Sequence, residues 1–387
     1  MSNLEGESMR ILFVCHERNL NGASRSLINI ISVLEKEHEL YALTCYPDGD
    51  MYDALKKHNV TVLVYPYATT IKSKNGSMQW FLKVIKYNFF SIFQNKSTAR
   101  KIADLIVEKK IDLVHSNTGV VDVGGIAARL ANVPHIWHIR EFGDLDFSMY
   151  PATLKRNYRA WMESHADRFV CISKAICQYY DCFSDQKKVV IYNGVDKGNI
   201  LEKHYQREND TIRFLISGRI LETKGQYEAV EACKILLSQG ITDFELHIAG
   251  SGRFDIPVTP ELMEHIILHG LVRDMPALRK KMDVELVCSR AEAFGRVTAE
   301  AMMGGMPVIG SATGGTVELI KHEQTGFLYP RGEYDKLAGY MKMFITSPEK
   351  IESMGRAAQQ YALEHFTIER CVSELLEVYH EVIDNRV

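Results

Sequence analysis

The sequence predicts an α/β protein with two doubly wound domains that face each other across a cleft. Short apolar segments rich in Val and Ile recur between longer helical patterns, which is typical of parallel sheets with helices on both faces. This alternation stops once, at a polar segment near the middle of the chain, and then restarts. At 387 residues the chain is also too long for one ordinary core, so two domains are expected.

The first half begins with an apolar strand that leads into a helix. Leu27, Ile30, Ile31 and Leu34 have the spacing of one helical face, and Gly22 is expected in the tight turn that enters this helix. We assign residues 1–195 to a first domain. Its expected strands are residues 11–15, 40–45, 60–65, 112–116, 134–139, 168–173 and 189–193.

The polar, strand-poor segment 197–210 is the expected linker. An amphipathic helix is expected to start near Thr367, so residues 196–365 are assigned to a second domain and 366–387 to a terminal helix. The expected strands of the second domain are residues 213–217, 244–249, 265–270, 284–288, 307–311 and 326–329. In such sheets, ligands bind at the carboxyl ends of the strands.

Composition excludes several classes of protein. With 46% hydrophobic and 25% charged residues the chain is expected to be globular, and no apolar run is long enough for a membrane-spanning helix. The leader MSNLEGES lacks the basic and apolar regions of a secretory signal. Eight cysteines without a Cys-x-x-Cys pair are typical of reduced thiols in a cytoplasmic protein. Gly250-Ser251-Gly252 lacks the third glycine of a dinucleotide fingerprint, which argues against a dehydrogenase.

Charge is distributed unevenly along the chain. Residues 1–195 hold 24 basic and 20 acidic residues, whereas residues 196–387 hold 22 and 29. No acidic residue occurs between Asp53 and Asp104, a stretch with nine Lys and Arg residues, which indicates an anionic partner. The chain as a whole is slightly acidic and has no recognition motif for nucleic acid, so no nucleic acid is expected.

Within this stretch, residues 78–101 combine cations with aromatic side chains. One interpretation is peripheral contact with an anionic membrane, and another is an ordinary helix whose aromatics pack in the first domain. A basic groove for an acidic glycan or a pyrophosphate group is a further interpretation. The residues concerned are Trp80, Phe81, Tyr87, Phe89, Phe90 and Phe93, with Lys83, Lys86 and Lys96.

Two glutamates mark the most informative segment, SRAEAFGRVTAEAMMGGMPVIGSATGG. Glu292 follows the strand 284–288, and Glu300 lies one turn into a helix expected to begin near Arg296, so both can face one ligand. The backbone N–H groups of the Gly295–Val297 region at this helix start suit a phosphate. Taken alone, the two carboxylates could equally be a helix cap and a solvated side chain.

Two cations flank the same edge of the predicted sheet. Arg219 comes directly after a strand, and Lys224 comes directly before a helix. Such a pair suits a diphosphate leaving group, because negative charge grows on it as a glycosidic bond breaks. A surface arginine and a helix-terminal lysine are the structural alternative.

Together these elements resemble the carboxyl-terminal half of the family 4 glycosyltransferases, retaining sugar-nucleotide transferases with two Rossmann-like domains in the GT-B architecture. The resemblance extends into the first half and covers nearly the whole chain, including a terminal helix that typically crosses back to the first domain. It is carried by Arg219, Lys224, Glu292, Phe294-Gly295, Glu300, Gly304-Gly305, Met306-Pro307-Val308-Ile309, Gly314-Gly315, and by the segments DLVHS, WHIREF, ADRFVCIS and IYNGVD.

The resemblance implies a role for each matching position on the donor. Arg219 and Lys224 would neutralise the diphosphate, and Glu300 would accept hydrogen bonds from the ribose hydroxyls. Glu292 would lie beside the donor sugar. The remaining donor-site positions implied are Gly22, Val272 in the base-gripping loop HGLVRD, the backbone N–H groups of Phe294 and Gly295, and Arg296 and Val297 at the helix start.

Further implications concern the acceptor side and the chemistry. His138 in WHIREF matches a family histidine near both sugars, and we take it as catalytic together with Glu292, Arg219 and Lys224. Ala23 stands where many members have a second glycine, and it could narrow the space beside the diphosphate. No metal or other cofactor is expected, and the Asp-x-Asp sequences at 48–50 and 144–146 are interpreted as loop acids.

The sequence thus predicts a cytoplasmic, metal-independent, retaining hexosyltransferase, with the inner face of the membrane as one possible location. Its donor would be a nucleoside-diphosphate sugar, of which a UDP-sugar is the commonest, and its acceptor a glycan or a lipid-linked glycan in surface polysaccharide synthesis. Two alternatives are a non-catalytic subunit that binds a nucleotide sugar or carbohydrate, and a sugar-nucleotide epimerase or hydrolase. The sugar, the base, the linkage and the oligomeric state are not predicted.

Overall fold

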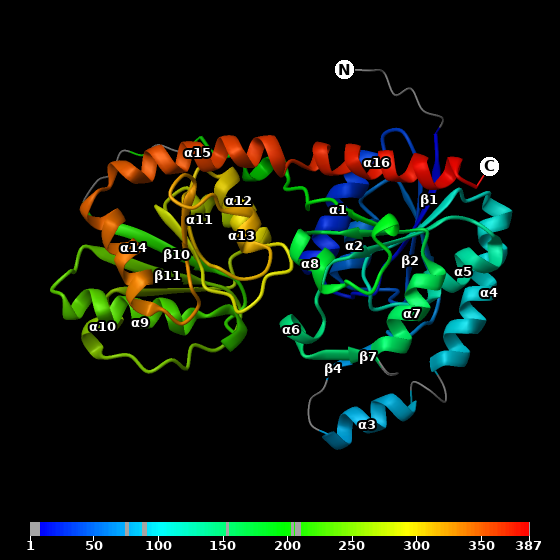
Figure 1. Cartoon of the computed structure of the whole chain (residues 1–387), viewed down its shortest axis with the longest axis horizontal. Helices are drawn as coiled ribbons and strands as arrows, with labels where there is room; N and C mark the ends of the chain where they lie inside the picture. The colour runs from blue at the N-terminus through cyan, green and yellow to red at the C-terminus, as the bar shows by residue number, and fades with distance from the viewer. Residues whose placement is uncertain are drawn as a thin grey trace. The chain divides into compact units, whose positions relative to one another are not determined.

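The computed structural model describes residues 8–73, 77–86, 91–151, 155–202, 205 and 210–386. The chain divides into two compact units (Figure 1). Unit 1 holds the described residues up to Gly194 together with those from Ile368 on, and unit 2 holds Val195–Thr367. The chain therefore passes between the units after Gly194 and again after Thr367.

The segment expected to be a linker belongs to unit 2. The side chain of Gln359 donates to the carbonyl oxygen of Leu201 at 3.0 Å. The hydroxyl of Tyr205 donates to the carbonyl oxygen of Gly305 at 2.9 Å. The described residues of the expected linker 197–210 thus belong to unit 2, and the chain passes between the units before this segment, after Gly194. Polar composition alone did not distinguish a linker from a surface segment that packs through its backbone.

Unit 1 is built on a parallel sheet in the order β3-β2-β1-β5-β6-β8-β9. By the right-handed crossover rule α1 and α2 cover one face, and α4 and α5 cover the other. The strands are β1 Arg10–Val14, β2 Glu39–Thr44, β3 Val60–Val64, β5 Leu113–Ser116, β6 His135–Ile139, β8 Arg168–Cys171 and β9 Lys188–Val190. The helices are α1 Gly22–Leu34, α2 Asp50–Leu55, α3 Ser77–Lys86, α4 Ile92–Lys109, α5 Val123–Ala131, α6 Asp144–Phe147, α7 Lys155–His165, α8 Lys174–Tyr179 and α16 Ile368–Asp384.

Unit 2 has the same kind of parallel sheet, in the order β12-β11-β10-β13-β14-β15. The strands are β10 Ile212–Ser217, β11 Phe244–Ala249, β12 Ile266–Gly270, β13 Val284–Val287, β14 Val308–Ser311 and β15 Gly326–Tyr329. The helices are α9 Gln226–Ser238, α10 Pro260–Glu264, α11 Met275–Arg279, α12 Arg296–Met303, α13 Thr316–Leu319, α14 Tyr334–Thr346 and α15 Glu349–His365.

These two sheets confirm the predicted fold class. Each expected strand is present, and the largest difference is in β9, which ends at Val190 rather than at residue 193. A second, two-stranded sheet of unit 1 was not predicted: β4 (Ile71–Ser73) pairs antiparallel with β7 (Met149–Pro151). Its strands are three residues long, too short for a periodic signal.

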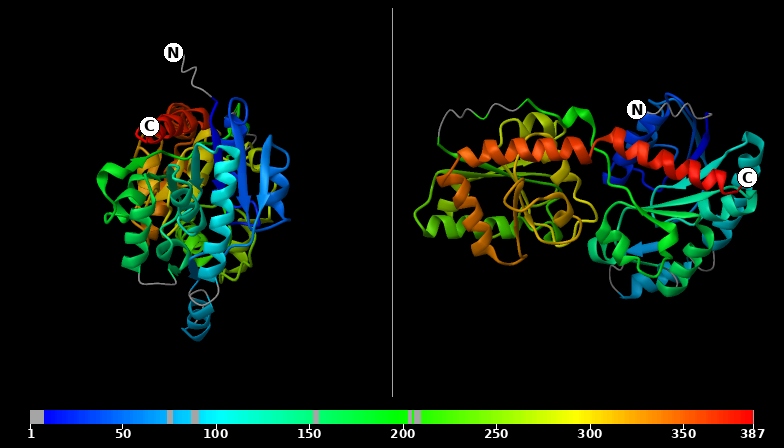
Figure 2. Two further views of the ribbon diagram at one scale, coloured as in Figure 1. Left: turned by 90° about the vertical axis from the view of Figure 1, so that its right-hand side faces the viewer. Right: turned by 45° about the horizontal axis from the view of Figure 1, so that its top comes forward.

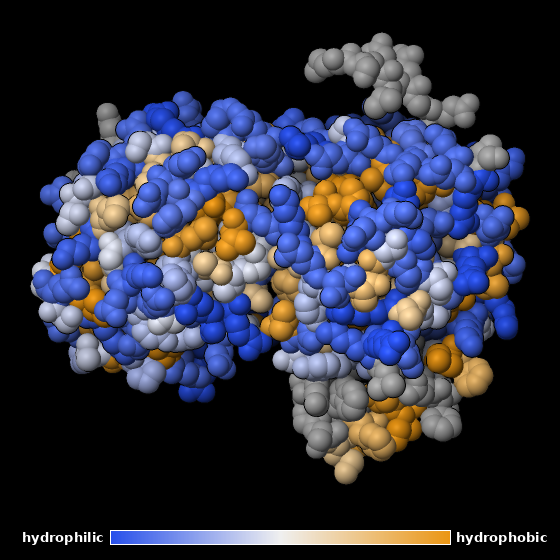
Figure 3. Space-filling model, in the orientation of Figure 1, coloured by the Kyte–Doolittle hydropathy of each residue, from blue (hydrophilic) through white to orange (hydrophobic). Residues whose placement is uncertain are grey.

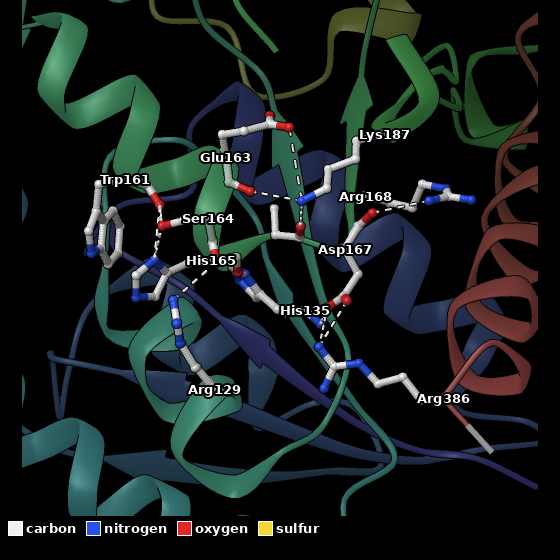
Figure 4. A network of polar contacts seen from close by, with 11 residues as sticks. Arg129, His135, Trp161, Glu163, Ser164, His165, Asp167, Arg168, Lys187 and Arg386 are labelled. Carbon is white, nitrogen blue, oxygen red and sulfur yellow. Dashed lines mark hydrogen bonds and ion pairs between the residues drawn. The ribbon is translucent and has the colours of Figure 1, made fainter. Parts of the chain in front are cut away.

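The terminal helix α16 packs against α1 in unit 1 (Figure 2). Its apolar face enters the unit 1 core through Leu375, Tyr379 and Val382. Polar contacts fix its carboxyl end, where the Arg386 guanidinium donates to both carboxylate oxygens of Asp167 at 2.8 and 2.9 Å (Figure 4). The same carboxylate accepts the backbone N–H of His135 at 2.8 Å, which ties α16 to the start of β6.

Candidate active site

The donor-site residues predicted in unit 2 follow the carboxyl ends of parallel strands, and these ends lie at one edge of the sheet. β10 pairs with both β11 and β13, so the strand order reverses between β10 and β13. In doubly wound sheets this switch point is where ligands bind. Arg219 follows β10 and Glu292 follows β13, so the structure brings the predicted cation and carboxylate loops to the switch point of unit 2.

The loops after β10 and β13 are joined through their backbones. The Arg290 N–H donates to the carbonyl oxygen of Thr223 at 2.8 Å. Gly225 has a φ of +72°, and a Cβ there would lie 2.0 Å from the carbonyl oxygen of Cys288. Only glycine allows the two backbones to come this close. This close approach places the preceding Lys224 beside the loop after β13.

Lys224 and Glu292 form an ion pair across these two loops. Lys224 Nζ lies 2.6 Å from Glu292 Oε1, with 35% and 17% of the two side chains exposed. Two predicted catalytic residues, one from each loop, are therefore in direct contact. A carboxylate paired in this way can face a sugar without adding net negative charge beside a diphosphate.

A third loop, after β14, supports the backbone of Glu292. The Gly315 N–H donates to the Glu292 carbonyl oxygen at 2.7 Å. A Cβ at Gly314 would lie 2.3 Å from that oxygen, and one at Gly315 would lie 2.5 Å from the carbonyl oxygen of Phe294. The Phe294 ring is buried against Phe366, so the turn from Glu292 to Gly295 is held on both sides.

Glu300 on α12 is held by two arginines. Arg279 Nη1 donates to Glu300 Oε2 at 2.9 Å, and Arg296 Nε donates to Oε1 at 2.6 Å. Burial alone would raise the pKa of Glu300, but the two guanidinium groups outweigh it and hold the pKa below its ordinary value. Glu300 is therefore ionised at neutral pH. A carboxylate offers about four acceptor positions, so two remain for hydroxyl donors.

Arg279 in turn belongs to a buried network under this edge. Its Nε lies 3.4 Å from Glu285 Oε2, and the hydroxyl of Ser217 donates to Glu285 Oε1 at 2.5 Å. The side chain of Arg279 is 2% exposed and that of Glu285 is fully buried. Since buried charges are tolerated only when paired and hydrogen-bonded, this network fixes the position of Arg279 and through it that of Glu300.

The other predicted donor-site positions take no part in the ion pairs described above. Arg219 is exposed, and its guanidinium makes no ion pair with the described residues. Val272 follows β12 and is half-buried, as is Val297 in the first turn of α12. Gly295 caps α12 with a φ of +104°, a conformation that favours glycine. Gly22 is the first residue of α1 rather than part of the preceding turn, and open space surrounds a Cβ built on it.

In unit 1, His138 lies on β6 in a buried chain of polar side chains. Its Nδ1 faces two groups, Arg140 Nη2 at 3.2 Å and His115 Nε2 at 3.2 Å. The His115 Nδ1 lies 2.6 Å from the hydroxyl of Tyr379 on α16. Arg140 is further fixed by Asn193, whose side-chain oxygen accepts from its Nη1 at 2.5 Å.

These contacts determine where His138 carries its proton. An arginine can only donate, so His138 Nδ1 accepts, and the proton of the neutral ring is on Nε2. Burial, with the nearby Arg140 charge, holds the pKa of His138 well below its ordinary value, which keeps the ring neutral. The Nε2 atom is buried and has no hydrogen-bond partner among the described residues. It is thus a buried donor group that the described residues leave unsatisfied.

The acids expected in loops pair locally. Asp48 forms an ion pair with Arg18 at 2.7 Å, and Asp144 forms one with Lys155 at 2.9 Å. Asp144 and Asp146 lie in the short helix α6 and Asp50 begins α2, so the expectation of loop acids is wrong for these three residues. In the described part of the chain, no group of three or more His, Cys, Asp or Glu residues could hold a metal ion.

Sequence reasoning did not single out Arg279, His115 or Tyr379. Arg279 stands before Lys280 and Lys281 and looks like part of a solvated basic run, while His115 and Tyr379 are 264 residues apart. One signal was available for Tyr379, because it lies on the apolar face of the terminal helix, where a phenol needs a buried partner. For Arg279 no sequence signal separates it from its neighbours.

Comparison with known families covers most of the chain. Residues 20–198 match the model of glycosyltransferase family 4, and residues 199–361 match that of glycosyl transferases group 1. A relative from Escherichia coli, UDP-Gal:alpha-D-GlcNAc-diphosphoundecaprenol alpha-1,3-galactosyltransferase, is 27% identical over 95% of both chains. N-acetyl-alpha-D-glucosaminyl L-malate synthase of Bacillus anthracis is 23% identical over 77% of this chain and 83% of its own.

Solved structures agree with this assignment at the level of the fold. HepE of Anabaena in complex with UDP is 22% identical and covers 96% of this chain and all of its own, with a TM-score of 0.78. The apo lipopolysaccharide outer core galactosyltransferase WaaB is 17% identical over 96% of this chain and all of its own, with a TM-score of 0.69. No helix among the described residues is long and apolar enough to cross a membrane.

Proposed function

Because this chain belongs to the group 1 and family 4 glycosyltransferases, we propose that it moves a sugar from a UDP-sugar to a glycan or lipid-linked acceptor in surface polysaccharide synthesis. The observation that carries the proposal is the ion pair between Lys224 and Glu292 at the sheet edge of unit 2. Lys224 lies on the same connection, between β10 and α9, as Arg219. The UDP bound to HepE and the lipid diphosphate named for the Escherichia coli relative support this donor and acceptor.

In the proposed reaction, Arg219 and Lys224 bind the diphosphate and Glu300 binds the ribose. Glu292 and the adjoining backbone N–H groups orient the sugar. The bond from the anomeric carbon to the diphosphate oxygen breaks, and a bond to the acceptor oxygen forms on the same face. The acceptor's proton passes to the departing diphosphate. His138 donates from Nε2 to the donor or acceptor, and Gly22 and Val272 border the diphosphate and the base.

We propose that the reaction needs no metal ion, because two side-chain cations at the diphosphate provide the positive charge that a metal otherwise supplies. The location proposed is the cytoplasmic face of the membrane, where nucleotide sugars meet a lipid-linked acceptor. Chelator is expected to leave turnover unchanged. Loss of turnover with chelator and its recovery with magnesium would contradict the metal-free reaction.

The test is a thermal-shift panel of UDP, GDP and ADP, with and without chelator, on the parent protein and Glu300→Ala. A ligand that binds only the folded state adds about 2.7 kcal/mol at a hundredfold excess over its dissociation constant, which is readily detected. We expect a shift with UDP that chelator does not alter and that Glu300→Ala abolishes. No shift with any nucleotide would favour a non-catalytic subunit that binds carbohydrate, or a site that is completed only by acceptor or membrane.

Product analysis separates the remaining alternatives. A transferase yields a new glycoside, an epimerase yields an isomeric nucleotide sugar, and a hydrolase yields free sugar. A non-catalytic subunit yields no product. Retention of the anomeric configuration is read from the same glycoside by the coupling constant of its anomeric proton.

A further inference from the structure

Helix α3 presents an unbroken apolar stripe to the outside of the protein. Met78, Phe81, Leu82 and Ile85 follow one another at the spacing of one helical face. Their exposed fractions are 70%, 56%, 58% and 38%. A stripe of this spacing ordinarily covers a core. Here the apolar atoms of α3 gather instead on the surface of unit 1 (Figure 3).

Contacts with the short strand β4 join α3 to the rest of unit 1. The helix contacts β4, which pairs with β7 in the small antiparallel sheet (Figure 1). Ile71 at the start of β4 is buried, and Val84 is less exposed than the stripe residues beside it. The helix is therefore joined to unit 1 through β4, while the four stripe residues stay exposed.

The amino-terminal half of α4 adds exposed cations to this part of unit 1. Phe93, Lys96 and Arg100 are exposed at the spacing of one helical face, with Phe93 68% exposed. Asn95, Thr98 and Ala99 on the other face are buried. Between Asp53 and Asp104 the chain has no acidic residue, so this half of α4 carries cations alone, and the first carboxylate along the helix is Asp104, four residues after Arg100.

We propose that the α3 stripe (Met78, Phe81, Leu82 and Ile85) inserts into the interface of an anionic lipid bilayer, while Lys96 and Arg100 on α4 contact the headgroups. Exposed apolar side chains flanked by lysines and arginines are the combination that such an interface binds. The proposal deepens the proposed function, because it names the surface by which the enzyme reaches a lipid-linked acceptor.

Other occupants fit this surface less well. A second copy of the chain would bring two acid-free, basic segments together, and their repulsion opposes such a contact. An acidic glycan would pair with the cations but would leave Met78, Phe81 and Leu82 exposed to water. A lipid surface satisfies the stripe and the cations at once.

The test is flotation of the full-length protein with vesicles of phosphatidylcholine alone and with about 30 mol% phosphatidylglycerol. We expect binding to the anionic vesicles, weakening as salt rises, and little binding to the neutral ones. The double variant Phe81→Ser/Leu82→Ser should bind at least about tenfold more weakly, since both side chains are exposed and the fold does not need them. The control Val107→Ser removes an apolar side chain that is 66% exposed elsewhere on α4, and should bind like the parent.

Three results would overturn the proposal. They are no binding of the parent to either vesicle, equal binding by the double variant, and self-association of the parent that the double variant abolishes. The last would identify the stripe as a contact between copies. UDP binding, followed by thermal shift in the same variants, separates this from the proposed function: vesicle binding without a UDP shift contradicts only the donor assignment, and a UDP shift without vesicle binding contradicts only the membrane surface.

Discussion

Lys224 Nζ lies 2.6 Å from Glu292 Oε1, although the two residues are 68 positions apart. Their loops leave the adjacent strands β10 and β13, and Gly225 allows the close approach between them. The pair is partly exposed, so its net contribution to stability is small, about 0–1 kcal/mol. A contact that adds so little to stability, at the switch point of a doubly wound sheet, is better explained by what it does to a ligand.

The first prediction concerns the two members of this pair. Lys224→Ala and Glu292→Ala should each lower turnover by about 10²–10³-fold, because each removes a charge placed where charge develops in the reaction. The melting temperature should change little, since both side chains are partly exposed. Turnover is measured as release of nucleoside diphosphate from the donor identified by the nucleotide panel.

A matched pair on α9 provides the control. Lys234 Nζ lies 2.7 Å from Glu231 Oε1, with 38% of each side chain exposed, and the pair lies on the helix surface. Lys234→Ala should therefore leave turnover unchanged. Parent-like turnover in either variant would contradict the catalytic role of the residue it replaces.

The second prediction concerns the glycine loop after β14. Gly315→Ala should lower turnover and stability together, because the new Cβ would lie 2.5 Å from the Phe294 carbonyl oxygen and push the Glu292 loop outward. The control is Gly339→Ala on α14, where nothing lies within 4 Å. That change should stabilise the protein by roughly 0.5–1 kcal/mol through helix propensity. Unfolding in urea measures both, and an equal loss in the two variants would contradict the steric argument.

The strands and the switch-point loops could be predicted because their signals are local. A buried parallel strand is a short apolar run between turn residues, and Arg219, Lys224, Glu292 and Glu300 stand next to such runs. Strand adjacency then brings the loops together without further information. The contact between Lys224 and Glu292 was not predicted, because it depends on how closely Gly225 approaches Cys288.

What supports the site depends on contacts between distant segments, and this part could not be predicted. Arg279 is buried although its neighbours in sequence are lysines, because Glu285 and Glu300 converge on it from β13 and α12. His115 meets Tyr379 only because the terminal helix returns to unit 1. The exposure of Phe81 and Phe93 also had to be observed, since a helix pattern alone does not show which face is covered. Tyr87, Phe89 and Phe90 lie outside the described residues.

The third prediction separates the two arginines that hold Glu300. Arg279→Met should destabilise the fold by about 3–5 kcal/mol, because it leaves the buried Glu285 carboxylate without its charge partner. Arg296→Met should cost at most about 1 kcal/mol, since this side chain is 21% exposed, yet it should still weaken UDP binding by loosening Glu300. Urea unfolding and nucleotide titration measure the two effects. Equal stability of both variants would contradict the buried network.

The fourth prediction concerns the chain from Tyr379 through His115 to His138. ¹⁵N spectra of the imidazole groups should show His138 as a neutral ring in the Nε2–H tautomer at neutral pH, because its pKa lies well below the ordinary value. Tyr379→Phe removes the donor to His115 Nδ1 and should give a mixture of tautomers at His115. Tyr361→Phe on α15 is the control. A charged His138 at pH 6 would contradict its role as a neutral donor.

The fifth prediction is a pH dependence of stability caused by Glu141. Burial, with a smaller contribution from the Asp146 charge, raises the pKa of this carboxyl to about 8, against an ordinary value of 4.5. The folded protein then keeps a proton that the unfolded chain releases between these two values. The contribution of Glu141 to the free energy of unfolding should therefore be greatest below pH 4.5. It should fall by about 1.4 kcal/mol per pH unit until the pH reaches about 8.

Glu141→Gln tests this dependence, because the amide resembles the protonated acid. Its oxygen can still accept the Gly119 N–H, which donates to Glu141 Oε1 at 2.8 Å. Relative to the parent, the variant should gain on the order of 4 kcal/mol between pH 5 and pH 8, measured by urea unfolding at each pH. Glu352→Gln, at an exposed position on α15, should show no such gain. A difference in unfolding free energy between Glu141→Gln and the parent that stays constant over this range would contradict the prediction. Glu141 would then be ionised in the folded protein, and burial would not raise its pKa.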